Sequence, residues 1–253
     1  TRHSEHTARV VSSYGSSMKA SACAQSVLEL HGICPEFPFE VSDEAKRIEH
    51  KGISEAEISS REDLRDMIIF TIDGADTKDI DDAISLSKEE DCYKLGVHIA
   101  DVSYYVKPKS ALDNEAFDRG TSVYYADRVV PMLPKELSNG ICSLNPDEDR
   151  LAFSCLMDIS FDGKLLGYDF KKTVIRSRIK GVYSEINKIL DNEETEEIKE
   201  KYKEVRDTIL LMQELATILT SNKIKRGAPQ IETPESKLII SEDDICIDVK
   251  TKE

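Results

Sequence analysis

An aspartate-rich segment of the chain reads Phe70-Thr71-Ile72-Asp73-Gly74-Ala75-Asp76-Thr77-Lys78-Asp79-Ile80-Asp81-Asp82-Ala83-Ile84. Five aspartates lie within residues 73–82. Upstream, residues 67–72 are apolar or β-branched without a Gly or Pro, which predicts a buried strand. Downstream, residues 83–87 alternate in polarity, which predicts a second strand with one face exposed to water. The aspartates are therefore predicted to lie on a loop that strands hold at both ends.

The carboxylates of this acid loop (residues 73–82) would repel one another by roughly several kcal/mol unless a cation neutralised them. Oxygen ligands without a nearby His or Cys favour a hard cation, Mg²⁺ before Ca²⁺. The loop lacks the alternating acids and the sixth-position glycine of an EF-hand. The alternative is a solvated acidic turn that binds nothing.

The composition is that of an ordinary globular chain, with 253 residues of which 40% are hydrophobic and 33% charged. This length allows one large domain or two small ones. No apolar run reaches the length of a membrane span and the first thirty residues lack a signal-peptide core, so we expect no membrane partner. The first residue is Thr1 and not Met, which suggests a processed or excised N-terminus. The six cysteines form no CxxC pair, so we expect neither zinc nor disulfides, and a cytoplasmic location.

The net charge of −15 argues, taken alone, against a nucleic-acid partner. Its distribution is uneven, because residues 61–160 hold 11 Lys and Arg against 21 Asp and Glu, whereas residues 164–188 hold seven basic residues against two acidic ones. This basic strip (residues 164–188) suits RNA phosphates, and its candidate contacts are Lys171, Lys172, Arg176 and Arg178. A solvated strand face is an equally good interpretation of the strip.

Local patterns predict a mixture of helices and strands. Capping residues and apolar spacing predict helices at about residues 19–31, 42–50, 54–66, 110–119, 184–190 and 195–226. Strand signals predict strands at 93–100 and 121–130, and hairpins at 150–161/165–178 and 236–240/245–249. The long helix at about 195–226 has an apolar stripe expected to pack on the sheet, made of Ile198, Tyr202, Val205, Ile209, Met212, Ala216 and Leu219.

These elements predict an α+β fold, with a mixed or antiparallel β-sheet core and flanking helices. Composition separates an N-terminal arm or linker with a short helix, residues 1–34, from a domain at residues 35–253. His98 lies within the predicted strand 93–100, and we interpret it as a buried structural histidine and not as a catalytic base.

Several short motifs occur in a fixed order, namely Thr71-Ile72-Asp73-Gly74, Asp79-Ile80-Asp81-Asp82-Ala83, Val97–Ser103, Arg119–Tyr124, Val130–Pro134 and Leu137–Pro146. Together they resemble the RNB domain of the ribonuclease II/ribonuclease R exoribonucleases. Gly74 and the Thr-Ser-Val-Tyr run are closer to the ribonuclease R branch. Weaker similarity extends from about Pro35 to Val249, so the chain resembles roughly the N-terminal half of that catalytic domain.

The resemblance implies hydrolysis of single-stranded RNA from its 3′ end to nucleoside 5′-monophosphates, dependent on Mg²⁺ or, in its place, Mn²⁺. It implies Asp73, Asp79, Asp81 and Asp82 as metal ligands, with Asp81 as the most critical catalytic carboxylate. It also implies that Tyr124 stacks on the base at the RNA 3′ end. The alternative for Tyr124 is a cross-strand aromatic contact within a sheet.

The chain also departs from the family pattern. The two later family stretches that supply arginines to the substrate phosphates are absent, and Lys180-Gly181-Val182-Tyr183 replaces the usual Arg-Leu/Met-Thr-Tyr. We therefore expect a fragment or one part of a split nuclease, whose partner is the remainder of the RNB domain in cis or in trans. The alternative is a catalytically incomplete RNA-binding or interaction module. A Ca²⁺-binding structural domain ranks below both.

Overall fold

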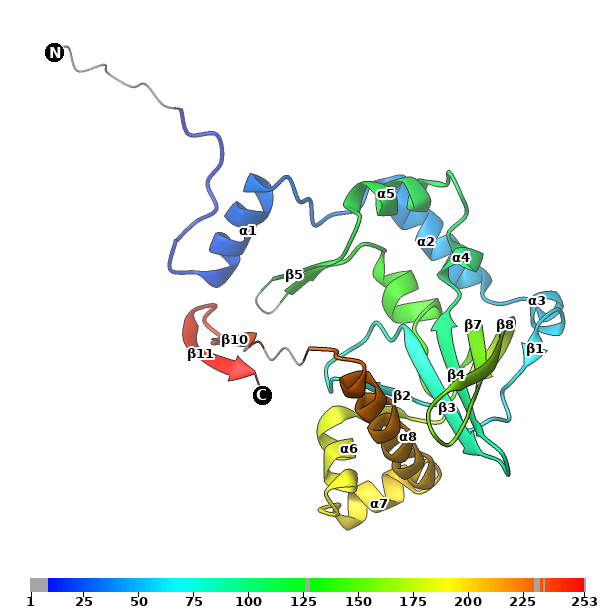
Figure 1. The fold of residues 1–253 in the computed structure, drawn as a ribbon. Coiled ribbons are helices and arrows are strands. Elements are labelled where there is room, and N and C mark those ends of the chain that lie inside the picture. Colours follow the sequence, from blue (N-terminus) through cyan, green and yellow to red (C-terminus); the bar gives the residue numbers. More distant parts are fainter. Residues whose placement is uncertain (1–8, 126–127, 230–232, 234, 253) are drawn as a thin grey trace. The chain divides into compact units, whose positions relative to one another are not determined.

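The structure of the chain is a computed structural model that describes residues 9–125, 128–229, 233 and 235–252. The described residues form two compact units, each assembled from separate stretches of sequence. The first unit draws on residues 1–37, 119–132 and 231–253, and the second on residues 38–118 and 133–230. Helices and strands are mixed throughout, which confirms the predicted α+β class (Figure 1).

A five-stranded sheet organises the second unit, with the strand order β1-β8-β7-β4-β3 (Figure 1). Its strands are β1 (Glu62–Asp63), β3 (Asp82–Lys88), β4 (Tyr93–Ala100), β7 (Asp149–Ile159) and β8 (Leu165–Arg176). Neighbouring strands pair antiparallel except for β1 and β8, which are parallel. The mixed sheet core, the strand at 93–100 and the hairpin formed by β7 and β8 are therefore confirmed.

A short parallel pair of strands adjoins the acid loop. It consists of β2 (Thr71–Asp73) and β9 (Lys180–Val182), and a single bridge between Phe70 and Ile84 connects the start of β2 to β3. The predicted strand at 67–72 is wrong in its extent, because residues 65–67 belong to a turn and only the end of the apolar run pairs.

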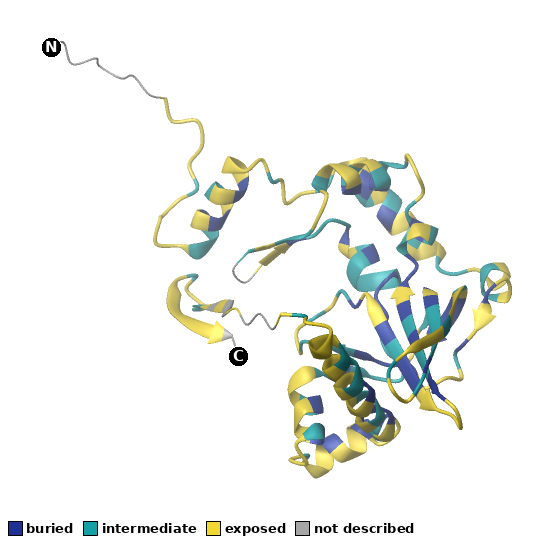
Figure 2. Ribbon diagram, viewed as in Figure 1, coloured by how far each residue is buried: buried dark blue, intermediate teal, exposed yellow. Residues whose placement is uncertain are grey.

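Three helices of the second unit pack on these strands, namely α6 (Tyr183–Leu190), α7 (Glu196–Tyr202) and α8 (Arg206–Lys225). Phe70 beside β2 lies in one apolar cluster with residues of all three helices. Leu215 of α8 lies in another with Leu86, Tyr93 and Ile159 of the sheet. Figure 2 shows buried residues along the strands and along the helices that cover them. The acid loop is therefore attached to a rigid, two-layered support.

The predicted continuous helix at 195–226 is wrong, because the structure has a break between α7 and α8. Tyr202 and Val205, on either side of the break, are both almost fully buried in the same cluster. The Tyr202 hydroxyl at the end of α7 is held by two hydrogen bonds, from the Val182 N–H at 2.9 Å and to Glu185 at 2.6 Å. The apolar stripe is also shifted after the break, since Leu215 is buried and the predicted Ala216 is exposed.

The other helical segments of the chain after residue 37 are α2 (Phe39–Lys51), α3 (Glu55–Ser59), α4 (Val102–Tyr105), α5 (Ala111–Arg119) and the π-helical turn η1 (Glu136–Ile141). Ser54 caps α3 as predicted, accepting a hydrogen bond from the Glu57 N–H at 3.2 Å. The predicted extension of this helix to residue 66 is wrong, because the chain enters β1 at Glu62 and pairs with β8 there.

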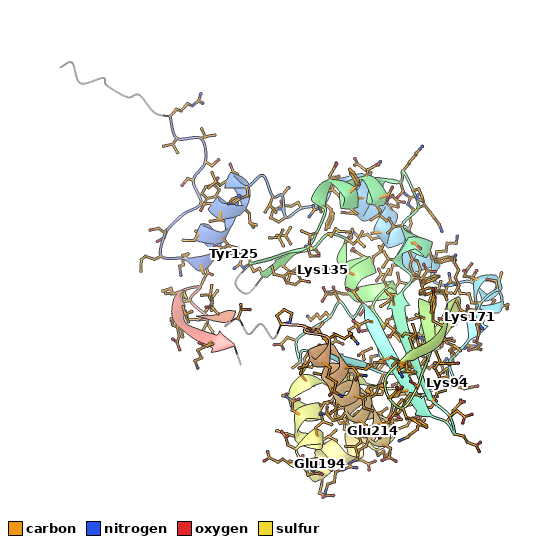
Figure 3. All side chains as sticks on the ribbon, in the orientation of Figure 1. Lys94, Tyr125, Lys135, Lys171, Glu194 and Glu214 are labelled. Carbon is orange, nitrogen blue, oxygen red and sulfur yellow. The ribbon has the colours of Figure 1, made fainter. Side chains whose placement is uncertain are left out.

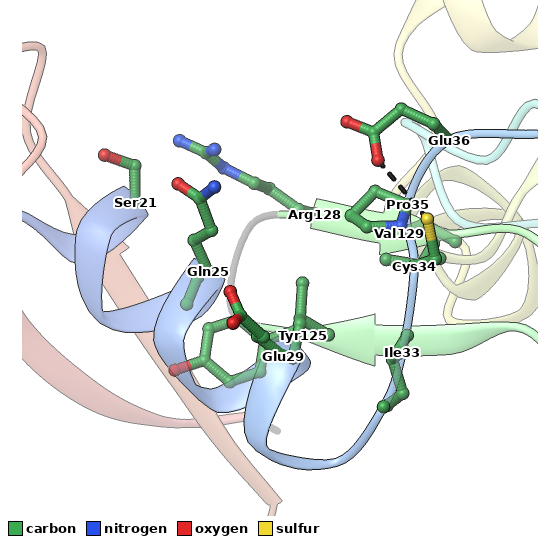
Figure 4. Close-up of a pocket in the computed structure, with 14 residues that line it drawn as sticks. Ser21, Gln25, Glu29, Ile33, Cys34, Pro35, Glu36, Tyr125, Arg128 and Val129 are labelled. Atoms are coloured by element: carbon green, nitrogen blue, oxygen red, sulfur yellow. Dashed lines mark hydrogen bonds between the residues drawn. The ribbon is translucent and has the colours of Figure 1, made fainter. Parts of the chain in front are cut away.

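The first unit contains α1 (Ala20–Leu30), β5 (Val123–Tyr125), β6 (Arg128–Val130), β10 (Glu235–Ile240) and β11 (Cys246–Lys252). The short N-terminal helix and the hairpin at 236–249 are thus confirmed. Residues of α1, β5 and β6, including Glu29, Tyr125 and Arg128, line a hollow of about 590 Å³ (Figure 4). The boundary between an arm at 1–34 and a domain at 35–253 stays a prediction. In the described part of the chain, no helix has both the length and the apolar composition required to cross a bilayer.

A chain of hydrogen bonds crosses four strands of the sheet. The ring of His98 on β4 lies 3.0 Å from Ser85 Oγ through Nε2 and 2.7 Å from Ser154 Oγ through Nδ1. Ser154 Oγ in turn lies 2.6 Å from Thr173 Oγ1 on β8. All four residues are buried, which confirms the structural interpretation of His98. Gly96 leaves room for the ring, because a Cβ at that position would lie 2.7 Å from His98 Nε2.

This network predicts a specific dependence of stability on pH. Burial lowers the pKa of His98 from 6.5 to about 4. The unfolded chain takes up this proton as the pH falls below about 6.5, whereas the folded chain takes it up only near pH 4, so the free energy of unfolding should fall by up to about 3 kcal/mol across that interval. Urea unfolding between about pH 7 and about pH 4.5 measures this slope. The His98→Asn variant should lose this part of the slope, and identical slopes in both proteins would contradict the assignment.

Candidate active site

The acid loop leaves β2 at Asp73 and enters β3 at Asp82. The fully buried side chain of Ser143 holds its second half. The Ser143 hydroxyl accepts a hydrogen bond from the Ile80 N–H at 3.1 Å and lies 2.8 Å from Lys78 O, to which it donates. The backbone around the last aspartates is therefore fixed by a residue that lies far away in the sequence.

Lys180 of β9 holds the first half of the loop. A turn opens the loop, with the Thr77 N–H donating to Gly74 O at 3.2 Å. The Lys180 ammonium donates to two carbonyl oxygens of this turn, to Ala75 O at 3.0 Å and to Thr77 O at 2.5 Å. Sequence analysis predicted no such role for Lys180 or for Ser143, because nothing in a single sequence indicates that either residue contacts the loop.

The four predicted metal ligands interact electrostatically. Burial raises the pKa of Asp81, and the negative charges of Asp79, Asp82 and Asp73 raise it further. Burial likewise raises the pKa of Asp73. A hydrogen bond from the Thr71 side chain and the charge of Lys180 oppose this rise, and the charges of Asp82 and Asp79 add to it. The carboxyl group of Asp81 is thus close enough to the other three to be influenced by their charges.

Two buried oxygen atoms at the start of the loop, Asp73 Oδ2 and Thr71 Oγ1, make no hydrogen bond of good geometry, although the Thr71 side chain lies close enough to Asp73 to lower the pKa of that carboxyl group. In the described residues, no three or more His, Cys, Asp or Glu side chains are drawn together tightly enough to hold a metal ion. The predicted ligands nevertheless have the chemistry that a hard cation requires, since all four are aspartates that offer carboxylate oxygens.

Tyr124 lies on β5 in the first unit, whereas the aspartates belong to the second. Its backbone pairs across the hairpin with Val129. The side chain is 71% exposed, and an exposed ring is what base stacking requires. The assignment of Tyr124 to the RNA 3′ end stays a prediction.

Three of the four predicted phosphate contacts are engaged within the protein. Lys171, labelled in Figure 3, forms an ion pair at 2.6 Å with Glu62 on β1. Arg176 forms an ion pair at 2.6 Å with Asp149 on β7. Arg178 donates to two backbone carbonyl oxygens in the turn before β2, at 3.1 and 3.2 Å. Lys172 is exposed on β8. Their role as phosphate contacts stays a prediction, and RNA would have to compete with these internal partners at three of the four residues.

The family model of the RNB domain matches residues 61–253, which include the acid loop and both residues that hold it. The chain belongs to the RNB-domain family. Its similarity to ribonuclease R is high over nearly its whole length: it is 46% identical to ribonuclease R of Thermotoga maritima over 246 residues, which cover 96% of this chain and 34% of the relative. It is 44% identical to ribonuclease R 1 of Lactococcus lactis over 227 residues, which cover 89% of this chain and 27% of the relative.

Comparison of structures gives the same family. The fold is similar to that of Mycoplasma genitalium RNase R in complex with ribose methylated single-stranded RNA, with a TM-score of 0.84 and 26% sequence identity. The similarity covers 95% of this chain and 37% of that protein. The chain thus spans about a third of the length of the relatives that it matches.

The acid loop predicts a metal-dependent change in stability. In metal-free buffer, the double variant Asp81→Asn/Asp82→Asn should melt at a higher temperature than the wild type, by about 2–4 °C for each kcal/mol of repulsion removed. Added Mg²⁺ should raise the melting temperature of the wild type, because it binds the folded state alone, and should leave the double variant unchanged. Differential scanning calorimetry measures both effects.

The matched control is Asp76→Asn, which removes an exposed carboxylate of the same loop outside the predicted ligand set. It should retain the full Mg²⁺-induced shift. An equal Mg²⁺-induced shift in the wild type and in the double variant would refute the assignment of the ligands.

Proposed function

We propose that this chain is the metal-binding part of an exoribonuclease that degrades single-stranded RNA from its 3′ end to nucleoside 5′-monophosphates with Mg²⁺, or Mn²⁺ in its place. The observation that carries the proposal is the group of mutually repelling carboxylates on a loop fixed from two sides. Its membership of the RNB-domain family and its similarity to proteins named ribonuclease R support the proposal.

In this function Asp73, Asp79, Asp81 and Asp82 would hold one or two Mg²⁺ ions. Bound Mg²⁺ would supply an activated water and stabilise the charge that develops on the leaving 3′ oxygen. Asp81 would have the largest catalytic role, as the resemblance of Asp79-Ile80-Asp81-Asp82 to the family motif implies. Tyr124 would stack on the terminal base, a contact that every base can make and that contributes about 1–3 kcal/mol.

The remainder of an RNB domain, in cis or in trans, is the proposed partner of the chain. The relatives that the chain matches are about three times longer. Three of the four predicted phosphate-binding side chains are already paired within this chain, so additional cations would be required to clamp the RNA backbone.

A cytoplasmic location is proposed from the cysteines. All six cysteines are free thiols, and two of them, Cys92 and Cys142, are buried. Unpaired cysteines in this number suit a reducing compartment.

The second candidate is an RNA-binding or interaction module without turnover. It is favoured by one observation, that the carboxylates in the described residues are not already drawn into a metal-binding group. The two candidates differ in whether metal converts bound RNA to mononucleotides.

The decisive experiment compares labelled oligoribonucleotide degradation by this chain alone, by a longer polypeptide that supplies the missing family stretches, and by the same longer polypeptide with Asp81→Asn. The chain alone should bind RNA weakly and release mononucleotides slowly, because uncompensated carboxylates repel the substrate. The longer polypeptide should be fast. Asp81→Asn should bind RNA nearly as well as its parent but release at least about a hundredfold less mononucleotide, since affinity comes from phosphate contacts and stacking and not from the metal-activated water.

If the Asp81→Asn variant releases mononucleotides nearly as fast as its parent, the catalytic role of Asp81 is refuted. Equal and processive degradation by the chain alone would show that the missing stretches are not required. Tight RNA binding without release in all three proteins would favour the interaction module.

A further inference from the structure

Lys180 is the one basic side chain that the described contacts bring onto the backbone of the acid loop. Its ammonium lies 3.0 Å from Ala75 O and 2.5 Å from Thr77 O. Neither contact is made to a carboxylate, so Lys180 is bonded to the frame of the loop and not to the acidic side chains. Its charge nevertheless acts on Asp73. Lys180 therefore has two separable effects on the site, one mechanical and one electrostatic.

The position of Lys180 is itself fixed by close packing. In the parallel pair of β2 and β9, Thr71 pairs with Lys180 and Ile72 pairs with Gly181. A Cβ on Gly181 would lie 2.6 Å from Thr71 O, so only glycine permits the strands to approach this closely. At the other end of β9, the Val182 N–H donates to Tyr202 Oη at 2.9 Å.

Tyr202, which holds the end of β9, is itself fixed in position. Tyr202 is fully buried, and its hydroxyl donates to Glu185 of α6 at 2.6 Å. Lys180 thus connects the acid loop to the helices α6 and α7 through a short strand that has little freedom to shift.

We propose that Lys180 is a positioning residue that holds the acid loop in the shape required for metal binding, an assignment that rests on the proposed function of the loop. Its hydrogen bonds to Ala75 and Thr77 keep the turn closed, which shortens the movement that Asp73 and the later aspartates need in order to gather around one cation. In the alternative role, the Lys180 ammonium would compete with the metal ion by neutralising the loop, and would therefore weaken metal binding. The two roles predict changes of opposite sign when the ammonium is removed.

The test uses Lys180→Met, which keeps an apolar stem and removes the charge and the donors, and Lys180→Arg, which restores both. Lys78→Met is the matched control, because Lys78 is an exposed lysine of the same loop whose removal changes the charge equally. Binding of Mn²⁺ to the whole chain is followed by the electron paramagnetic resonance signal of the free ion. Hydrogen exchange of the metal-free protein reports the closure of the loop over residues 74–80.

If Lys180 positions the loop, Lys180→Met loses at least about tenfold in Mn²⁺ affinity, a typical effect of removing a residue that orients metal ligands. This loss occurs although the variant loop is more negative. Exchange of residues 74–80 becomes faster, while exchange in β4 and β7 is unchanged. Lys180→Arg recovers binding toward the wild-type level, and Lys78→Met binds Mn²⁺ as well as or better than the wild type.

Equal or tighter Mn²⁺ binding by Lys180→Met would overturn the assignment, whether or not the loop exchanges faster. If the wild type and Asp81→Asn/Asp82→Asn bind Mn²⁺ equally, the metal site itself is refuted, and hydrogen exchange alone then decides whether Lys180 closes the loop. Unchanged exchange in Lys180→Met would in that case overturn the positioning role as well.

Discussion

Repulsion between the carboxylates of the acid loop is the constraint on which the rest of the second unit depends. The negative charges of Asp73, Asp79 and Asp82 raise the pKa of Asp81, so these ionised side chains would move further apart if the loop were free to move. Here the backbone is bonded to Ser143 on one side and to Lys180 on the other. The fold therefore maintains an arrangement that is unfavourable in the absence of a cation, as is common where stability is given up for function.

The sheet and the helices of the second unit hold opposite ends of the acid loop. The five-stranded sheet fixes the exit of the loop into β3, and its interior is satisfied by neutral groups through the chain of hydrogen bonds centred on His98. The helices α6, α7 and α8 fix the entry, because they pack on Phe70 and anchor β9 through Tyr202. The charged loop is thus supported by a sheet whose buried polar groups around His98 are hydrogen-bonded. The unfavourable electrostatic free energy of the carboxylates is therefore confined to the acid loop.

Local sequence signals predicted what is encoded locally. The strand Tyr93–Ala100 and the acid loop were both recognisable, since alternation and a dense run of aspartates need no knowledge of the rest of the chain. Contacts between distant residues were missed. Ser143 and Lys180 reach the loop only after the chain has folded, and the break between α7 and α8 lies within a stretch that the sequence alone presents as one continuous helix. The residues that shape the site were therefore harder to find than the residues that carry its charge.

The most direct test of this account is the titration of the Asp73 and Asp81 carboxyl groups, followed by carbon-detected NMR with and without Mg²⁺. Without Mg²⁺, both groups should titrate above the ordinary range of aspartate, because burial and the neighbouring carboxylates disfavour their ionised forms. With Mg²⁺, both pKa values should fall, since a bound cation favours the ionised forms. Ordinary pKa values for both groups that do not respond to Mg²⁺ would contradict a loop built to hold repelling carboxylates for a metal ion.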